Sequence, residues 1–197
     1  MKKEALEMAK SSFEIEAKVI LDTAAKMDWA AFSKAVLLLS QAERTAVSGC
    51  GHSGIACRHF AHSLCCIERP ARFLSPAEAT HGATGFLQKG DVLVLASRGG
   101  KTSELIPIIN IAKEKNVSVI SVTENVDSPM AQLSDVTLPL KVYRETDRFD
   151  AQGTSSFVAV AAVFDALQVA IMEETGYQGK QFALIHPGGA VGERLNK

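Results

Sequence analysis

A short apolar run, followed at once by a loop of small residues, limits the folds open to this chain more than any other stretch. Val92 to Ala96 have the length and composition of a strand that is covered on both faces, as in a parallel sheet. Ser97–Ser103 then brings two glycines and three hydroxyl side chains, and Glu104 opens a helical pattern with Thr102 or Ser103 as the expected N-cap. The order of strand, loop and helix indicates an α/β fold.

The same stretch is suited to bind an anion. The free N–H groups and the positive end of a helix N-terminus attract negative charge, and glycines let the backbone approach a ligand closely. We predict that residues 97–103 bind a phosphate. The alternative is an ordinary strand–helix turn in which the glycines and hydroxyls only cap the helix, and a Gly-Gly pair taken alone favours that alternative.

From Arg44 onward the chain alternates between strand and helix patterns. Strands are predicted at residues 45–48, 71–74, 91–97, 117–122 and 136–139, and helices at residues 54–66, 103–115, 129–133 and 154–174. Right-handed crossovers between such strands give a parallel sheet with helices on both faces. Ser128 is expected to cap the short helix that Pro129 begins.

Two helical patterns occupy residues 4–40, before the first strand. Leu6, Phe13, Ile20 and Leu21 share one face of the first helix. The second carries an apolar stripe made of Trp29, Phe32, Val36, Leu37 and Leu39. Packing on the sheet edge and packing on a second subunit would both bury these stripes. Near the other end, His186 and Pro187 lie in an expected loop.

Composition excludes several classes of protein. The 197 residues suit one well-buried domain, and 47% hydrophobic and 22% charged residues are typical of a globular chain. A net charge of -1 gives no general attraction to nucleic acid or to an anionic membrane. No signal peptide, CxxC pair or apolar run of membrane-spanning length is expected, so we predict a cytoplasmic protein with free thiols.

A second loop resembles the first in composition. Residues 49–54, Gly-Cys-Gly-His-Ser-Gly, end one predicted strand and open a helix. A dinucleotide is disfavoured, because the acidic ribose partner could only be Glu68, which precedes the next strand instead of ending it. Two such loops at the carboxyl ends of strands favour a crevice for one small phosphorylated ligand, with no cofactor.

Three residues in or near these loops could move protons. Glu104 follows the phosphate-type loop, and His81 and His186 lie in other predicted loops. Imidazole titrates near neutral pH and burial can raise a carboxyl toward it, so the set could act on a sugar. For each residue taken alone, a surface or packed side chain is the favoured alternative, and their shared position beside the expected crevice argues against it.

A metal site and a basic surface are less favoured interpretations. His59, His62 and Cys66 share a helical face that could ligate zinc, but an amphipathic packing helix is preferred and no metal is predicted. Residues 144–150 alternate in charge and are expected to form a surface connection or a subunit contact.

Taken together, these motifs resemble the sugar isomerase (SIS) domain and, within it, the arabinose 5-phosphate isomerase family, over residues 45–195. The matching segments are residues 49–54, 76–82, 102–105 and 186–195, the last reading His-Pro-Gly-Gly-Ala-x-Gly-x-Arg-Leu. The resemblance implies a flavodoxin-like, three-layer α-β-α fold with five parallel strands. It also implies a tetramer with sites shared between subunits, and aldose–ketose isomerisation without an organic cofactor.

The chain departs from the family's pattern at several positions. His52 replaces a lysine and is not a permanent cation at neutral pH. Where the family reads Ser-Asn-Ser-Gly-Glu-Thr, Gly99 removes a hydroxyl while Arg98 and Lys101 add positive charge, so we expect a more cationic phosphate loop. Ala83 stands where the family has Asp. The family usually continues into two CBS modules, and we expect residues 1–197 to be a single SIS domain with a helical extension at 1–40 and no such modules.

The resulting hypothesis is a sugar-phosphate isomerase, most specifically one that interconverts D-arabinose 5-phosphate and D-ribulose 5-phosphate through a cis-enediol. The predicted phosphate ligands are Ser53, Ser97, Arg98, Gly99, Gly100, Lys101, Thr102 and Ser103. Glu104, with His81 or His186, would transfer the proton, and His52 would polarise a sugar oxygen. The alternatives are a non-catalytic sugar-phosphate-binding module and a SIS isomerase for a hexulose or amino sugar phosphate.

Overall fold

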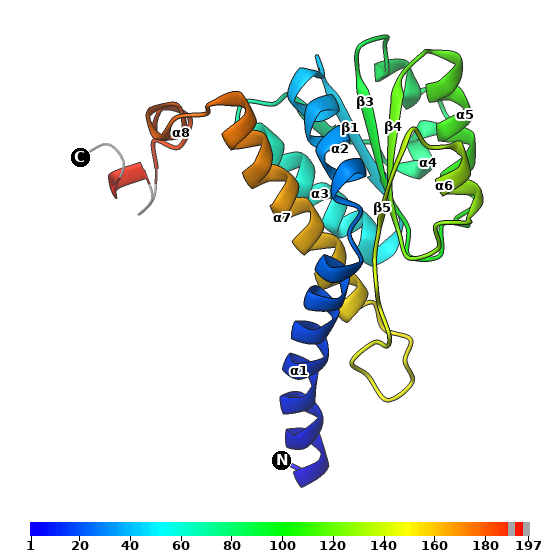
Figure 1. The fold of residues 1–197 in the computed structure, drawn as a ribbon, viewed down its shortest axis with the longest axis vertical. Helices are drawn as coiled ribbons and strands as arrows, with labels where there is room; N and C mark the ends of the chain where they lie inside the picture. Colours follow the sequence, from blue (N-terminus) through cyan, green and yellow to red (C-terminus); the bar gives the residue numbers. More distant parts are fainter. Residues whose placement is uncertain (189–191, 195–197) are drawn as a thin grey trace.

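The sheet of the protein has five parallel strands between two helical layers (Figure 1). The structure is a computed structural model that describes residues 1–188 and 192–194. The strands are β1 (Thr45–Gly49), β2 (Ala71–Phe73), β3 (Val92–Ala96), β4 (Ser118–Thr123) and β5 (Val136–Pro139), and their order is β2-β1-β3-β4-β5. The ends of all five strands lie within one residue of the predicted limits. The predicted flavodoxin-like fold class is confirmed.

The strand order places a crevice between β1 and β3. The chain leaves β1 toward β2 on one side and continues from β3 toward β4 on the other, which makes this the point where the direction of winding reverses. Gly49 pairs with Ala96 at the ends of these two neighbouring strands. The two small-residue loops therefore start side by side at the same edge of the sheet.

Alternate side chains of β3 enter different cores. Val92, Val94 and Ala96 pack into a core shared with helices α1 (Lys3–Lys26), α2 (Trp29–Gln41), α3 (Gly51–Cys65) and α7 (Ser155–Thr175). Leu93 and Leu95 pack on the opposite face with α4 (Pro76–Ala79), α5 (Ile106–Glu114) and α6 (Pro129–Leu133). Successive side chains of a strand point to opposite faces, so a strand with helices on both faces contributes to two cores. Figure 1 shows the two helical layers on either side of the sheet.

Some helix ends differ from the predictions. Ser128 does cap α6, accepting a hydrogen bond from the Ala131 N–H at 3.3 Å. Helix α5, in contrast, begins at Ile106 after Leu105, so the predicted capping by Thr102 or Ser103 is wrong. The Thr102 hydroxyl instead bonds with the Ser97 hydroxyl, and the Ser103 hydroxyl donates to the Glu104 carboxylate. The segment around His81 was predicted as a loop, but it contains α4 and a 3-10 helix, η1 (Ala83–Phe86).

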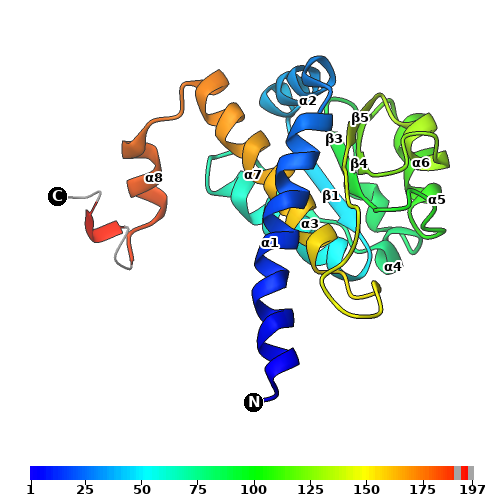
Figure 2. The same ribbon diagram turned by 60° about the horizontal axis from the view of Figure 1, so that its bottom comes forward.

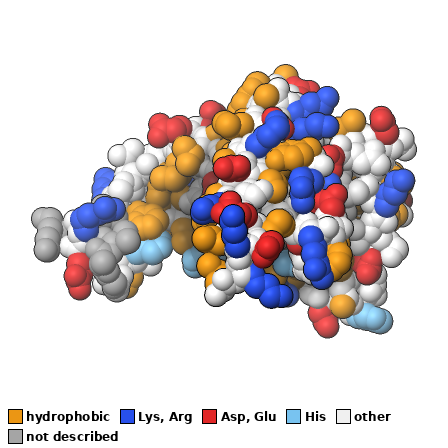
Figure 3. All heavy atoms as spheres, turned by 90° about the horizontal axis from the view of Figure 1, so that it is seen from below, with side chains coloured by type: hydrophobic (Ala, Val, Ile, Leu, Met, Phe, Trp, Pro, Cys, Tyr) orange, Lys and Arg blue, Asp and Glu red, His pale blue; other side chains and the backbone are white. Residues whose placement is uncertain are grey.

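Two elements project from the body of the molecule (Figure 2). Helix α1 buries Ile15, Val19 and Thr23, whereas the predicted stripe remains exposed, with Phe13 at 76% and Leu21 at 69%. Side chains of both charges lie among hydrophobic ones when the molecule is viewed from below (Figure 3). Because Phe13 and Leu21 are exposed, no other part of the described chain covers the α1 stripe.

The second projecting element follows α7. Helix α8 (Gly179–Ile185), which was not predicted, forms a capping box between Gln178 and Gln181, and the expected loop at His186 and Pro187 follows it. The Tyr177 hydroxyl donates to the Cys66 carbonyl at 2.9 Å, which fixes the base of this arm. Beyond that point α8 lies away from the sheet (Figures 1 and 2).

Helix α7 is the one helix in the described part of the chain that is long and apolar enough to cross a membrane. The expectation that no apolar run approaches membrane-spanning length is therefore wrong, since residues 155–175 have both the length and the apolar composition. The helix packs against α1, α2 and α3, and its buried side chains include Phe164, Leu167 and Ile171. These contacts are those of a core helix.

Candidate functional site

The loop between β3 and α5 presents free backbone donors. The Gly100 N–H donates to the Ser97 carbonyl at 3.1 Å and to its hydroxyl at 3.2 Å, and the Ser97 and Thr102 hydroxyl oxygens lie 2.9 Å apart. The N–H groups of residues 99 and 101–103 donate no hydrogen bond to any described residue. Four unsatisfied donors just before a helix form the arrangement that binds a phosphate.

Gly100 holds this loop in shape. Its φ of +63° lies in the left-handed region, and an added Cβ would collide with the Ser128 side chain. Its carbonyl accepts from the Met130 N–H at 3.2 Å. Helix α6 therefore supports the loop from behind, and only glycine fits at this position.

The loop after β1 has a similar arrangement. Gly51 has a φ of +53°, and the N–H groups of residues 51–53 donate to no described residue. Gly54 packs so closely on the Gly49 carbonyl that a Cβ would lie 2.5 Å from its oxygen. The His52 ring lies beside the start of α7, 6.4 Å from the Phe157 ring, and Ser53 is half-buried in the first turn of α3. Both loops thus offer free donors to one crevice.

A pocket of about 430 Å³ opens next to the two loops. Its walls come from the loop after β1 and the start of α3, from the end of β2 with residues 75–77, and from Glu104. The lining residues of the first two segments are Gly49, Cys50, Gly51, Gly54, Ile55, Arg58 and Phe73, so His52, Ser53 and residues 97–103 are not among them. Burial raises the pKa of the Cys50 thiol, and the nearby Glu104 carboxylate adds to that rise. Glu104 therefore faces the first loop across this pocket, as the sequence interpretation required.

Glu104 itself is exposed in the single chain. A hydrogen bond from its own N–H and one from the Ser103 hydroxyl, at 2.9 Å, hold the pKa of Glu104 below its ordinary value. The expected rise through burial is thus reversed. The group is a carboxylate at neutral pH, which is the form that can accept a proton.

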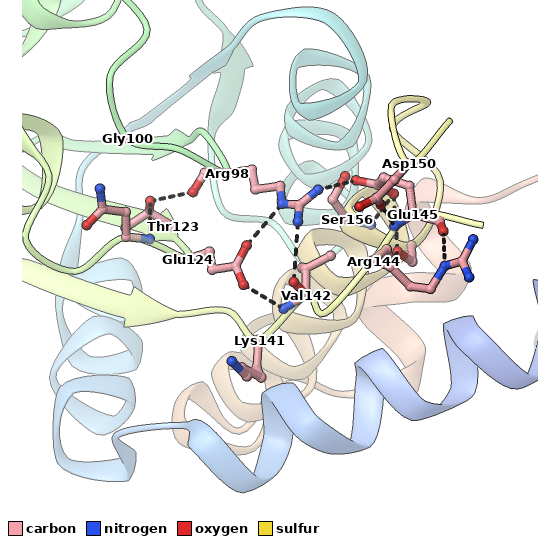
Figure 4. Close-up of polar contacts among 12 residues, drawn as sticks. Arg98, Gly100, Thr123, Glu124, Lys141, Val142, Arg144, Glu145, Asp150 and Ser156 are labelled. Carbon is pink, nitrogen blue, oxygen red and sulfur yellow. Dashed lines mark hydrogen bonds and ion pairs between the residues drawn. The ribbon is translucent and has the colours of Figure 1, made fainter. Parts of the chain in front are cut away.

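The two cations that were predicted for the phosphate loop have different surroundings. Lys101 is exposed beside the free N–H groups and has no ion pair among the described residues. Arg98 turns away: its Nε donates to Glu124 at 3.0 Å and its Nη1 to Glu145 at 2.9 Å (Figure 4). Its Nη2 donates to the Val142 carbonyl at 3.3 Å. The guanidinium is therefore committed to the protein, and the expected contribution of Arg98 to a cationic phosphate loop is corrected.

Glu145 is a residue that the sequence interpretation missed. It was assigned to a surface connection, yet it is 2% exposed. One carboxylate oxygen accepts from the N–H groups of Thr154 and Ser156 at the start of α7 and from the Ser155 hydroxyl, while the other meets Arg98. Burial raises the pKa of Glu145, but the bonds from Ser156, Ser155 and Thr154 outweigh it and leave the pKa lowered. The three consecutive hydroxyl residues Thr154, Ser155 and Ser156 at the start of α7 were the sequence signal that could have indicated a buried acceptor nearby.

Neither of the two predicted histidines lines the pocket that Glu104 lines. His81 is exposed just after α4. His186 follows α8 on the projecting arm, where its ring stacks on Phe182 at 3.7 Å and contacts the Phe182 carbonyl. Residues 189–191 and 195 of the closing motif lie outside the described residues. The pocket of the single chain thus unites Glu104 with the loop after β1, and it includes neither histidine.

The candidate zinc ligands make contacts along α3 and with the neighbouring α7. His59 lies 3.5 Å from Asp165 and 3.5 Å from the Ser63 hydroxyl, and His62 lies 3.5 Å from Cys66. Within residues 1–188 and 192–194, no group of three or more such side chains could hold a metal ion.

Comparison with known families identifies one domain. Residues 38–170 match the SIS domain. The arabinose 5-phosphate isomerase KdsD of Pseudomonas aeruginosa is 36% identical over 159 residues, which cover 81% of this chain and 49% of the relative. The chain thus spans about half the length of the curated relatives it matches.

Solved structures share nearly the whole fold. A structure from Listeria monocytogenes, described as a candidate sugar-phosphate isomerase, has a TM-score of 0.91 and 41% identity, covering 95% of this chain and 100% of the other. A protein of Escherichia coli CFT073, solved in complex with A5P, has a TM-score of 0.88 and 26% identity, with the same two coverages. The five-stranded sheet and its helical layers are therefore common to all three chains.

Proposed function

The chain belongs to the SIS domain family, and from that premise we propose that it is a sugar-phosphate isomerase that interconverts an aldose and a ketose. The substrate pair we favour is arabinose 5-phosphate and ribulose 5-phosphate, because of the 36% identity to KdsD and the A5P bound to a structural neighbour. The observation that carries the proposal is the row of free N–H groups beside a pocket that holds Glu104.

In this proposal the loops bind the phosphate, and the pocket holds the part of the sugar that reacts. The phosphate lies against the N–H groups of residues 99 and 101–103, with the hydroxyls of Ser53, Ser97, Thr102 and Ser103 and the Lys101 ammonium around it. Glu104 takes the proton from C2 of the aldose, which gives a cis-enediol, and returns a proton to C1, which gives the ketose. His52 contacts a sugar oxygen. No organic cofactor takes part in these steps.

Assembly completes the site in this proposal. The exposed α1 stripe and the arm that carries His186 both need a second copy to be covered. In a homotetramer, a neighbouring chain would bring His186 or His81 to Glu104 as the second proton-transfer group. The compartment that we expect is the cytoplasm.

The decisive experiment combines a panel of sugar phosphates with proton exchange at C1 and C2 in D₂O. Glu104→Gln should lower turnover about 10² to 10⁴-fold while inorganic phosphate still binds, because only proton transfer is removed. Glu114→Gln, an exposed carboxylate on α5, is the matched control and should behave as wild type. A Glu104→Gln enzyme with wild-type turnover on a verified substrate would show that this assignment is wrong.

A second candidate is a non-catalytic sugar-phosphate-binding module, which is favoured because neither His81 nor His186 lines the pocket that Glu104 lines. Such a protein would keep the two loops and bind a sugar phosphate without exchanging its protons. Tight binding of a panel member with no exchange at C1 or C2 would favour the module. Turnover of a hexulose or amino sugar phosphate, but of no pentose phosphate, would instead change the substrate within the isomerase proposal.

A further inference from the structure

Arg58 is a cation in the pocket wall that neither the loops nor the proposed proton transfer uses. It lies on α3, and its guanidinium stacks over the Phe73 ring, with the central carbon 3.9 Å from the ring centroid. Phe73 is fixed against the start of α3, 3.8 Å from the position of a Cβ at Gly54. The aromatic platform therefore holds Arg58 in place while leaving its N–H donors available.

The charge of Arg58 is not neutralised by a carboxylate. Unlike Arg98, Arg58 forms no ion pair within the part of the chain that the structure describes, although Glu104 lines the same pocket. A permanent cation and a carboxylate thus face one cavity without meeting each other. A polar ligand placed between them could contact both.

The order of the strands aligns the pocket with the phosphate loop. Phosphate would lie at the end of β3, and the Arg58–Phe73 pair lies beyond β1 at the end of β2. Neighbouring strands are about 4.8 Å apart, so the two places are separated by roughly 10 Å. An extended pentose phosphate spans a comparable length, which puts its C1–C2 end in the pocket between Glu104 and Arg58.

We propose that Arg58 is a catalytic residue that binds the oxygen at C1 and stabilises the negative charge which develops there. When Glu104 takes the C2 proton, the electrons of the C2–H bond form a C1–C2 double bond, and those of the carbonyl move to the C1 oxygen. Two guanidinium N–H groups can donate to that oxyanion and to the C2 oxygen. A guanidinium carries a permanent positive charge, which suits it to this role. The inference rests on the proposed isomerase function.

The test compares Arg58→Gln with Arg72→Gln. Arg72 is a matched control, since it also stacks on a phenylalanine, Phe86, at 4.9 Å, but does not line the pocket. Arg58→Gln should lower kcat by about 10² to 10³-fold, as expected when a donor to a developing oxyanion is lost. Its affinity for a phosphorylated hydroxamic acid, which imitates the enediolate, should fall by a similar factor.

Two further measurements separate this effect from general damage. Inorganic phosphate should bind Arg58→Gln within about twofold of wild type, because the phosphate loop is untouched, and Arg58→Lys should recover part of the lost kcat by restoring the charge. Equal kcat and equal hydroxamate affinity in the Arg58→Gln and Arg72→Gln proteins would overturn the proposal.

Failure of the isomerase function itself would be seen differently. In that case the wild type would turn over no sugar phosphate, and binding would decide the role of Arg58. Weaker sugar-phosphate binding in Arg58→Gln, with phosphate binding unchanged, would then keep Arg58 as a ligand of the sugar end. Unchanged sugar-phosphate binding in Arg58→Gln would show that Arg58 does not contact the ligand.

Discussion

Arg98 and Glu145 show how surroundings decide what a charged side chain does. Read along the chain, Arg98 lies in a phosphate-type loop and Glu145 in a segment of alternating charge. In the folded protein they meet at 2.9 Å, and Glu145 also receives donors from the start of α7. Glu145 thus occupies a helix N-terminus that could otherwise attract an anion, and Arg98 compensates its charge.

The stability of the protein should therefore depend on Glu145 in a pH-dependent way. Because the folded pKa lies below the ordinary value of 4.5, this contribution is present above pH 4.5 and is lost as the pH falls through the folded pKa. Glu145→Gln should cost about 3 kcal/mol of unfolding free energy at pH 7, since it leaves Arg98 and several donors badly matched.

Urea unfolding at pH 7 and in the acid range measures this contribution. The difference between wild type and Glu145→Gln should shrink toward acid pH, whereas Glu174→Gln, an exposed carboxylate near the end of α7, should lie within about 0.5 kcal/mol of wild type throughout. A difference for Glu145→Gln that stayed constant with pH would exclude the charge as its origin.

The β3–α5 loop can be tested as an element through its two adjacent glycines. Gly100 needs a positive φ and has Ser128 against it, whereas Gly99 has open space around the position of a Cβ and no positive φ. Gly100→Ala should lose about 2 to 4 kcal/mol of stability and at least tenfold in phosphate affinity, because the loop must move to relieve strain and collision.

Gly99→Ala should stay within about 0.5 kcal/mol of wild type and provides the comparison. Calorimetric titration with inorganic phosphate and thermal unfolding of both variants give the two quantities. If Gly100→Ala bound phosphate as well as Gly99→Ala does, the loop shape described here would not be what creates the phosphate site.

Secondary structure was predictable where local composition decides it. The five strands and α6 follow from apolar runs and from a Ser-Pro start, and each was placed to within a residue or so. Helix α8 and the short helices around His81 were missed, because glycine and proline near them are ordinary turn signals. The start of α5 was also misplaced, since Thr102 bonds to Ser97 and Ser103 to Glu104 instead of capping the helix.

At the scale of the whole molecule, the exposed face of α1 predicts assembly. Phe13→Glu combined with Leu21→Glu should lower the mass measured by light scattering, because two charges would enter a surface that another copy buries. Ser11→Glu is the control, since it faces another side of the same helix, two residues from Phe13. An unchanged mass for the double variant would show that α1 does not form the interface.

Turnover should fall together with the mass if a neighbouring chain supplies a histidine to each site. The phosphate loop lies within one chain, so inorganic phosphate should still bind the dissociated protein. Lost turnover with retained phosphate binding would indicate a folded chain with an incomplete site, whereas loss of both would indicate an unfolded chain.

By itself, the sequence determined the parallel sheet, the two glycine loops and the position of Glu104 beside them, because these depend on local runs and on backbone freedom. Only the tertiary structure decided where the charged side chains point. The two carboxylate partners of Arg98 lie 26 and 47 residues away along the chain, and the pocket that unites Arg58 with Glu104 joins three separate segments. Such contacts depend on how the layers pack, and no local pattern encodes them.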